Sequence, residues 1–340
     1  MLCRTAENVF WMSRYVERAV AVARVLDVTW NLELDAGHLA GTDVAFWAGL
    51  LDAPGGDGAA AGGGLAVIAH HEIRHYLAFD EANPNSLVSC VRQARTAARG
   101  VRESISSEMW EQLNSLYLSL SDPQVAKEAG EAPYAFYRRV REGAQFFLGL
   151  ADCTLARDEP WHFICLGRYL ERADNVARAL ALEAQLLRGG DGARGDELVR
   201  WLVVLRSCGS AEAYSRYYSL RVEPARVVEF LLLNPVFPQS VRFSLNEAWR
   251  ALQGIVGPDT RAGGANAAVR ALGRLRARLD HAAVDEILEE GLEPFLQGVQ
   301  RQINAVGEEI TRTYLRDEPS PGRLVAAERA AMIMAAQQQQ

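Results

Sequence analysis

The sequence has few cysteines, and their spacing suggests no pairing. Among its 340 residues are five cysteines, at positions 3, 90, 153, 165 and 208, and no two of them form a Cys-x-x-Cys motif. An odd number of widely separated cysteines provides neither a disulfide framework nor a zinc ribbon, and it suits a reducing compartment. We therefore expect a cytoplasmic protein in which Cys90, Cys153 and Cys165, on apolar helix faces, belong to the core.

Long apolar runs and an excess of positive charge are also missing. No run approaches the roughly 20 residues that a membrane-spanning helix needs. Arg4, Glu7 and Arg14 interrupt the first apolar residues, so we expect no signal peptide. The formal net charge of −7 argues against electrostatic binding to nucleic acid or to an anionic membrane surface, and we expect partners of neither kind.

Motifs for nucleotide binding and for nucleophilic catalysis are absent too. The glycine-rich stretch 53–64 lacks the Gly-Lys-Ser/Thr ending of a phosphate-binding loop, and it predicts a flexible loop instead. No Ser/His/Asp or Cys/His combination in the sequence suggests a catalytic nucleophile. We therefore expect no bound cofactor.

What the sequence does contain is a repeated segment. Residues 14–19 read Arg-Tyr-Val-Glu-Arg-Ala and residues 168–173 read Arg-Tyr-Leu-Glu-Arg-Ala, at an offset of 168 − 14 = 154. From position 14 to position 26, nine of thirteen residues are identical to those 154 places later. Such internal similarity indicates a duplicated structural unit. We predict two diverged copies of one module, 1–158 and 159–318, followed by a weakly ordered tail, 319–340.

Apolar residues at three- and four-residue spacing predict a series of helices. In the first copy the predicted helices are 5–34, 42–51, 65–79, 87–104, 107–120 and 133–157. Ser86 and Ser107 are candidate N-caps, and Pro160 stands in the first turn of the helix that carries the second repeat. Glycine-rich stretches predict further loops at 189–195 and 254–264. Because no stretch alternates as a strand does, we predict an all-α helical bundle, in which the two copies pack about a pseudo-twofold axis.

The two repeated helices, which we call the signature helices, each carry a charged face. The residues concerned are Arg14, Glu17, Arg18 and Arg24 in the first copy, and Arg168, Glu171, Arg172, Asn175 and Arg178 in the second. If this face were solvated, its charges would add almost nothing to the stability of the helix, because the repulsion between two arginines four residues apart offsets the attraction of one glutamate. Two other interpretations are a network that joins the halves and a site for a carboxylate or phosphate group. In the second, Glu17 and Glu171 are candidate general acids or bases.

One short motif spells a metal site. Residues His71-Glu72-Ile73-Arg74-His75 match the zinc motif H-E-x-x-H, in which a helix places two histidines on one face with the glutamate beside them. Arg74 adds a cation inside the motif, and residues 225–229 of the second copy contain no histidine. Glu81 or Glu103 would have to supply the third ligand. A surface histidine cluster at 70–75 is the simpler interpretation, and a zinc hydrolase is the alternative.

The repeated segments resemble a known family. Residues 4–19 (Arg-Thr-Ala-Glu-Asn-Val-Phe-Trp-Met-Ser-Arg-Tyr-Val-Glu-Arg-Ala) and 166–174 (Leu-Gly-Arg-Tyr-Leu-Glu-Arg-Ala-Asp) are similar to the bacterial alpha-E family, an uncharacterised all-helical family named for its Glu-Arg motif. The resemblance continues through Trp110 and covers about 1–318. The family motif maps onto Glu17-Arg18 and Glu171-Arg172. The first copy departs from it, since Val20-Ala21 replaces the polar pair Asp174-Asn175.

The resemblance implies partners more than it implies chemistry. Members of that family are typically encoded beside, or fused to, a circularly permuted ATP-grasp ligase, often with a transglutaminase-like peptidase and sometimes with a proteasome-like peptidase. Such neighbours suggest a pathway that joins and trims amide bonds in a peptide or amino-acid substrate. We therefore expect a helical partner of the ligase, whose charged faces dock it or bind a carboxylate or phosphate. The alternative is an enzyme of the same pathway, with Glu171/Arg172 and Glu17/Arg18 as acid/base and anion clamp.

Overall fold

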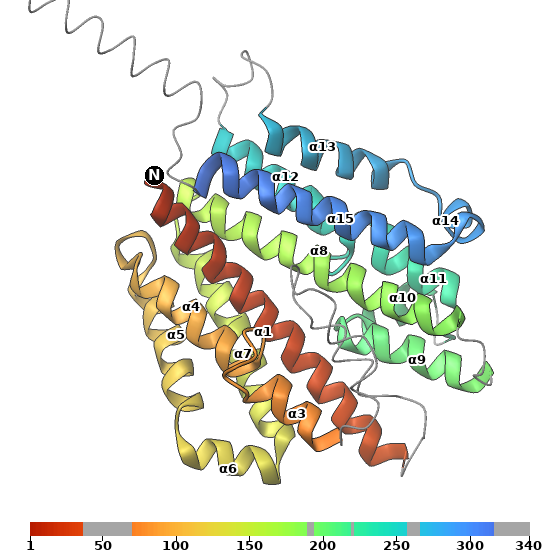
Figure 1. Cartoon of the computed structure of the whole chain (residues 1–340), viewed down its shortest axis with the longest axis horizontal. Helices are drawn as coiled ribbons and strands as arrows, with labels where there is room; N and C mark the ends of the chain where they lie inside the picture. The colour runs from red at the N-terminus through yellow and green to blue at the C-terminus, as the bar shows by residue number, and fades with distance from the viewer. Residues whose placement is uncertain (37–69, 189–193, 219–220, 257–265, 316–340) are drawn as a thin grey trace, which may run out of the picture.

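The fold is all-α throughout the described part of the chain. The computed structural model describes residues 1–36, 70–188, 194–218, 221–256 and 266–315, in which every regular element is a helix (Figure 1). No helix among these residues is long and apolar enough to cross a membrane. The predicted helix 42–51, the predicted loop 53–64 and the tail 319–340 lie outside the described residues.

Two long helices run through the middle of the molecule. They are α1 (Cys3–Ala36) and α8 (Glu159–Arg188), which lie side by side and contact each other over much of their length (Figure 1). These are the two signature helices, and Pro160 stands in the first turn of α8 as predicted. Every other helix is arranged around this central pair.

Each central helix is packed against its own set of neighbours. The elements between α1 and α8 are α3 (His70–Ala78), α4 (Leu87–Arg99), the 3-10 turn η2 (Arg102–Ser104), α5 (Ser107–Leu120), α6 (Pro123–Glu131) and α7 (Pro133–Thr154). Of these, α3, α4 and α7 pack on α1, and α5 packs on α4 and α7. The later elements are α9 (Arg194–Ser207), α10 (Ala211–Tyr218), α11 (Pro224–Val228), η3 (Glu229–Leu233), α12 (Val241–Val256), α13 (Ala267–Asp280), α14 (Val284–Glu290), α15 (Leu292–Ile310) and η5 (Thr311–Leu315). Among them, α12 and α15 pack on α8, and α9 and η5 contact α1.

The caps agree with the sequence at one helix and differ at the next. Ser86 caps α4 as predicted, because its hydroxyl accepts a hydrogen bond from the Ser89 N–H at 3.2 Å. Helix α5 is capped by Ser106, whose hydroxyl accepts from the Met109 N–H at 3.2 Å, so Ser107 is the first helical residue and the predicted cap was one place late.

Several predicted boundaries were wrong. Helix α4 ends at Arg99 and not at 104, because the chain turns at Gly100 into η2, and α7 ends at Thr154 and not at 157. Helix α6 was not predicted. Helix α9 already begins at Arg194 and α12 continues to Val256, so each runs into a stretch that was predicted as a loop. Glycine lowers helix propensity only modestly, and packing overrides it there.

The cysteine prediction holds for two of three residues. Cys90 and Cys165 are buried, whereas Cys153 is exposed near the end of α7. Burial in apolar surroundings raises the pKa of the Cys90 thiol and of the Cys165 thiol to about 12. Both thiols are therefore protonated core residues at neutral pH.

The two central helices are in close contact at Gly167. A Cβ atom added at this position of α8 would overlap the side-chain oxygen of Ser13 and the carbonyl oxygen of Phe10, both on α1. A backbone carbonyl cannot move away without distorting the helix that contains it. Gly167 is therefore required so that the charged faces of α1 and α8 can meet.

We predict that Gly167→Ala destabilises the protein. Because the added methyl group forces α1 and α8 apart, the free energy of unfolding should fall by about 1–3 kcal/mol or more. Gly149→Ala in α7 is the matched control, since nothing lies within 4 Å of a Cβ there and the helix should gain about 0.5–1 kcal/mol. Urea unfolding of the two variants measures both values. Equal stability of the two variants would contradict the close approach.

Candidate functional site

The first half of the site is an ion-pair network around Glu171. Its carboxylate, from α8, accepts a hydrogen bond from Arg14 Nε at 2.7 Å and another from Arg18 Nε at 2.6 Å, both from α1. The terminal nitrogen of Arg18 adds a third bond at 3.1 Å. Glu171 is only 1% exposed, so this charge depends entirely on the two arginines.

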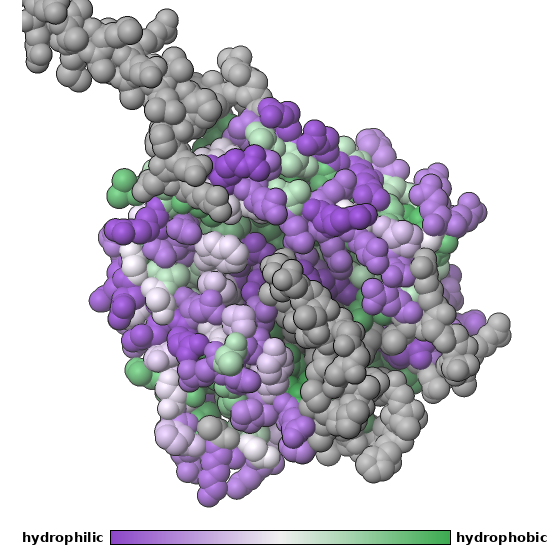
Figure 2. Space-filling view, viewed as in Figure 1, coloured by the Kyte–Doolittle hydropathy of each residue, from purple (hydrophilic) through white to green (hydrophobic). Residues whose placement is uncertain are grey.

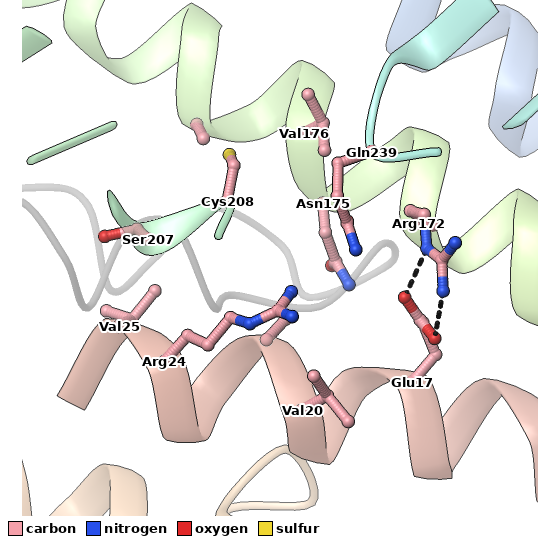
Figure 3. Close-up of a pocket in the computed structure, with 12 residues that line it drawn as sticks. Glu17, Val20, Arg24, Val25, Arg172, Asn175, Val176, Ser207, Cys208 and Gln239 are labelled. Atoms are coloured by element: carbon pink, nitrogen blue, oxygen red, sulfur yellow. Dashed lines mark hydrogen bonds and ion pairs between the residues drawn. The ribbon is translucent and has the colours of Figure 1, made fainter. Parts of the chain in front are cut away.

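The same arrangement occurs in the opposite direction around Glu17. Its carboxylate, from α1, accepts from Arg172 Nε at 2.6 Å and from a terminal nitrogen of Arg172 at 3.0 Å, a two-point contact (Figure 3). Arg168 is less engaged than its counterpart Arg14, because its Nε is 3.9 Å from Glu17 and its terminal nitrogen lies 3.3 Å from Asp152. Glu17 therefore has one close arginine, whereas Glu171 has two.

Arg18 and Arg172 also bind the loops that precede α4 and α12. A terminal nitrogen of Arg18 donates to Asn85 Oδ1 at 2.6 Å, just before α4. Arg172 donates from the equivalent nitrogen to the Pro238 carbonyl oxygen at 3.2 Å, just before α12. Ser240 caps α12 by accepting from the Phe243 N–H at 3.0 Å, as Ser86 caps α4. Arg18 thus links Glu171 of α8 to the loop before α4, and Arg172 links Glu17 of α1 to the loop before α12.

The two glutamates are held in their charged form. Burial alone would raise the pKa of Glu171, but the charges and hydrogen bonds of Arg18 and Arg14 outweigh it and bring the pKa to about 2. The same balance lowers the pKa of Glu17, where Arg172 is the main opposing charge. A buried carboxylate that stays ionised at neutral pH is a poor proton carrier, so this geometry favours a structural network.

The remaining predicted residues have different environments. Arg178 pairs with Asp174, four residues earlier on α8, at 2.9 Å. Arg24 and Asn175 line a narrow cavity between α1, α8 and the end of α9, with a volume of about 30 Å³ (Figure 3). The Glu17–Arg172 pair forms one end of this cavity. Sequence reasoning missed Ser207, Cys208 and Gln239, which also line it, because only the fold brings these distant segments together.

A wider groove lies on the Glu171 side of the central pair. It has about 1560 Å³ of empty space, counting the part that opens to solvent. Its lining includes Arg14 and Arg18 together with Trp11, Tyr15, Pro84, Asn85, Gln93, Leu170, Ile303, Asn304, Gly307, Glu308, Thr311 and Arg312. Most of this lining comes from α1 and α15, on a mainly polar face of the molecule with scattered apolar side chains (Figure 2).

No described residue is placed to complete a metal site with the two histidines of the zinc motif. His71 in the first turn of α3 and His75 in its last turn are exposed, and Glu81 pairs with Arg92. Within the ranges that the structure describes, no three His, Cys, Asp or Glu side chains are arranged to hold a metal ion. The structure thus contains no observation that favours the zinc hydrolase, and the surface histidine cluster accounts for these residues.

Comparison with known proteins identifies relatives that are themselves uncharacterised. The model of the Alpha-E family, described as a predicted alpha-helical domain with a conserved ER motif, matches residues 1–315. Uncharacterised proteins of Mycobacterium bovis and of Mycobacterium tuberculosis strain CDC 1551 are each 25% identical over 333 residues, and one of strain H37Rv is 24% identical. The alignment covers 92% of this chain but only 37% of each relative's length. No solved structure matches.

We predict that acid weakens the fold through Glu171. A pKa of about 2, below the ordinary value of 4.5, means that the carboxylate contributes its full stability above pH 4.5 and loses it as the pH falls toward 2. The loss from this one group amounts to about 3 kcal/mol. Urea unfolding at pH 5, 4 and 3 measures the slope.

The control for this experiment is Glu142→Gln. Glu142 pairs with Arg138 on the exposed side of α7, so its replacement should leave the pH dependence unchanged. Glu171→Gln should flatten the curve between pH 4.5 and pH 2. A wild-type stability that is constant over this range would contradict the buried pairing.

Proposed function

The chain belongs to the Alpha-E family, and from that membership and the reciprocal ion pairs we propose that it is a helical partner of a circularly permuted ATP-grasp amide ligase. The ligase would act on a peptide or amino-acid substrate in the cytoplasm. In this proposal the chain contributes a rigid docking surface, and the ligase carries out ATP chemistry. A transglutaminase-like peptidase is a further expected partner.

The observation that carries the proposal is how the signature residues are used. Arg18 and Arg172 donate their shortest hydrogen bonds, from Nε, to Glu171 and Glu17 inside the protein. A signature that builds a rigid α1–α8 pair is suited to a subunit that positions something else. The enzyme alternative, with these glutamates as acid/base, is supported less well, because their lowered pKa values keep them charged.

The length of the relatives supports the same conclusion. The chain spans 37% of the length of the curated relatives that it matches, so in those proteins the helical module is joined to a longer additional segment. In such a protein the helical module acts beside the attached segment at a raised effective concentration, as a subunit that serves a neighbouring domain would.

We also infer that the fold is a duplication with a pseudo-twofold axis between α1 and α8. The supporting observations are the repeat at an offset of 154 and the exchange of Glu–Arg bonds in both directions. Such an exchange is what two equivalent helices make when they pack face to face about an axis. The copies would be 1–158 and 159–318, packed as one domain.

The groove beside Arg14 and Arg18 is the docking surface that we assign to the ligase. Trp11 and Tyr15 supply aromatic surface there, and Arg312 is exposed at its rim. Tryptophan, tyrosine and arginine are the residues that dominate binding energy at protein interfaces. Arg14 and Arg18 themselves are mostly used by Glu171, so the outer residues of the groove should decide affinity.

We predict that reversing charge in this groove weakens ligase binding without unfolding the chain. The variant is Gln93→Glu with Arg312→Glu, which adds negative charge at two positions of the groove lining, one of them the exposed Arg312. Co-expression with an ATP-grasp protein of the same genome, followed by size-exclusion chromatography and titration calorimetry, measures the complex. Affinity should fall at least about tenfold, which corresponds to about 1.4 kcal/mol.

The control is Arg274→Glu on α13, an exposed arginine that lies outside this groove. It should bind as the wild type does. A complex of unchanged affinity in the groove variant would move the docking surface elsewhere. If wild-type protein forms no complex at all, the partner proposal fails.

A further inference from the structure

The narrow cavity beside Glu17 and Arg172 contains one charge that the protein does not balance. Arg24, from α1, lies along this cavity, and no hydrogen bond or ion pair with another described residue reaches its guanidinium group. Glu17 and Arg172 form the neighbouring pair, and their charges cancel. The charged lining of the cavity is therefore one positive charge in excess.

The two copies differ at the position that would balance it. On α8, Arg178 pairs with Asp174 four residues earlier, at 2.9 Å. Arg24 stands 154 places before Arg178, but Val20 occupies the position equivalent to Asp174 and cannot pair with it. The first copy thus keeps the arginine and lacks its carboxylate, so an external carboxylate would complete the pair.

The surroundings leave the charge uncompensated. Burial lowers the pKa of Arg24, and the attraction of Glu17 does not fully offset this effect. Asp27, which lines the adjoining cavity beyond Arg24, already accepts from Arg141 at 2.8 Å. Gly209, with a φ of 64°, lies directly against the guanidinium group, where a Cβ would come within 2.9 Å of Arg24 Cζ. The end of α9 therefore fixes the position of Arg24.

Further donors face the same space. Figure 3 shows the end groups of Arg24, Asn175 and Gln239 turned toward the interval between α1 and α8. The side-chain nitrogen of Asn175 is buried and has no hydrogen-bond partner among the described residues. Buried polar groups normally have partners, so this cavity lacks acceptors.

We propose that this cavity binds the carboxylate group of a small ligand, with Arg24 as its ion-pair partner and Asn175 and Gln239 as hydrogen-bond donors. A carboxylate supplies one negative charge and several acceptor sites, which match the single excess charge and the unpartnered donors. Val20, Ala21 and Val176 form an apolar wall for the carbon next to the carboxylate. A phosphate dianion would leave one negative charge unbalanced in a narrow, partly apolar space.

The test is a titration of the isolated chain with sodium acetate, followed by NMR of the arginine Nε–Hε resonances. The Arg24 signal is assigned by its loss in Arg24→Met. We expect a saturating shift of this signal with acetate, none with sodium chloride at equal ionic strength, and a weaker effect with inorganic phosphate. Asn175→Ala should weaken acetate binding about tenfold, whereas Arg274→Met on α13 should not change it.

The outcomes separate the proposal from its competitors. The carboxylate assignment is overturned if the Arg24 resonance shifts as much with sodium chloride as with sodium acetate. It is also overturned if the shift saturates only with phosphate. Because Arg24 is unbalanced without ligand, Arg24→Met should melt at the same temperature as the wild type or higher, and a lower melting temperature would mean that Arg24 serves to stabilise Glu17. Carboxylate binding in this cavity does not depend on the ligase. Only the biological role of the bound ligand rests on the proposed function. If Asn175→Ala loses acetate binding, as read from the Arg24 signal, and still forms the ligase complex, the carboxylate site and the docking surface are separate.

Discussion

The structure depends on an exchange of buried charges between two helices. Taking Glu17 and Glu171 out of water is unfavourable, and the arginines of the opposite helix provide most of the compensation among the described residues. A sliding movement of α1 along α8 would break several of these bonds at once and leave charges unpaired in the interior. The exchange therefore sets the register of the two helices more than it adds to net stability, and Gly167 makes it possible by allowing close contact.

The exchange is unequal, and the two sides of the central helix pair differ accordingly. Glu171 is held by two arginines, and its side of the molecule is a broad groove bordered by Trp11 and Tyr15. Glu17 is held closely by Arg172 alone, and its side is a narrow cavity with the unbalanced Arg24. In the repeated segment, Val20-Ala21 on α1 stands at the positions that Asp174-Asn175 occupies on α8. Arg178 therefore has a carboxylate partner on its own helix, whereas Arg24 has none there.

Much of the fold could be predicted because its signals are local. Helical spacing predicted α1 and α5 to within two residues at each end, and it predicted where α4 begins, whereas α6, only nine residues long, was missed. Two further limits concern tertiary structure. Which side of a charged helix is buried depends on what packs on it, so the sequence left three interpretations of the Glu-Arg face open. The cavity wall at Ser207 and Gln239 comes from segments distant in the chain, and no spacing rule relates them to Arg24.

The most direct test of this account is a double-mutant cycle at Glu17 and Arg172. Glu17→Leu and Arg172→Met are made singly and together, and urea unfolding gives the free energy of each. If the two side chains compensate each other in the interior, each single variant loses about 3–5 kcal/mol, because it leaves a buried charge unpaired. The double variant then loses at least about 2 kcal/mol less than the sum. Losses that add to within about 0.5 kcal/mol would show that the two charges act independently, and the central claim would be wrong.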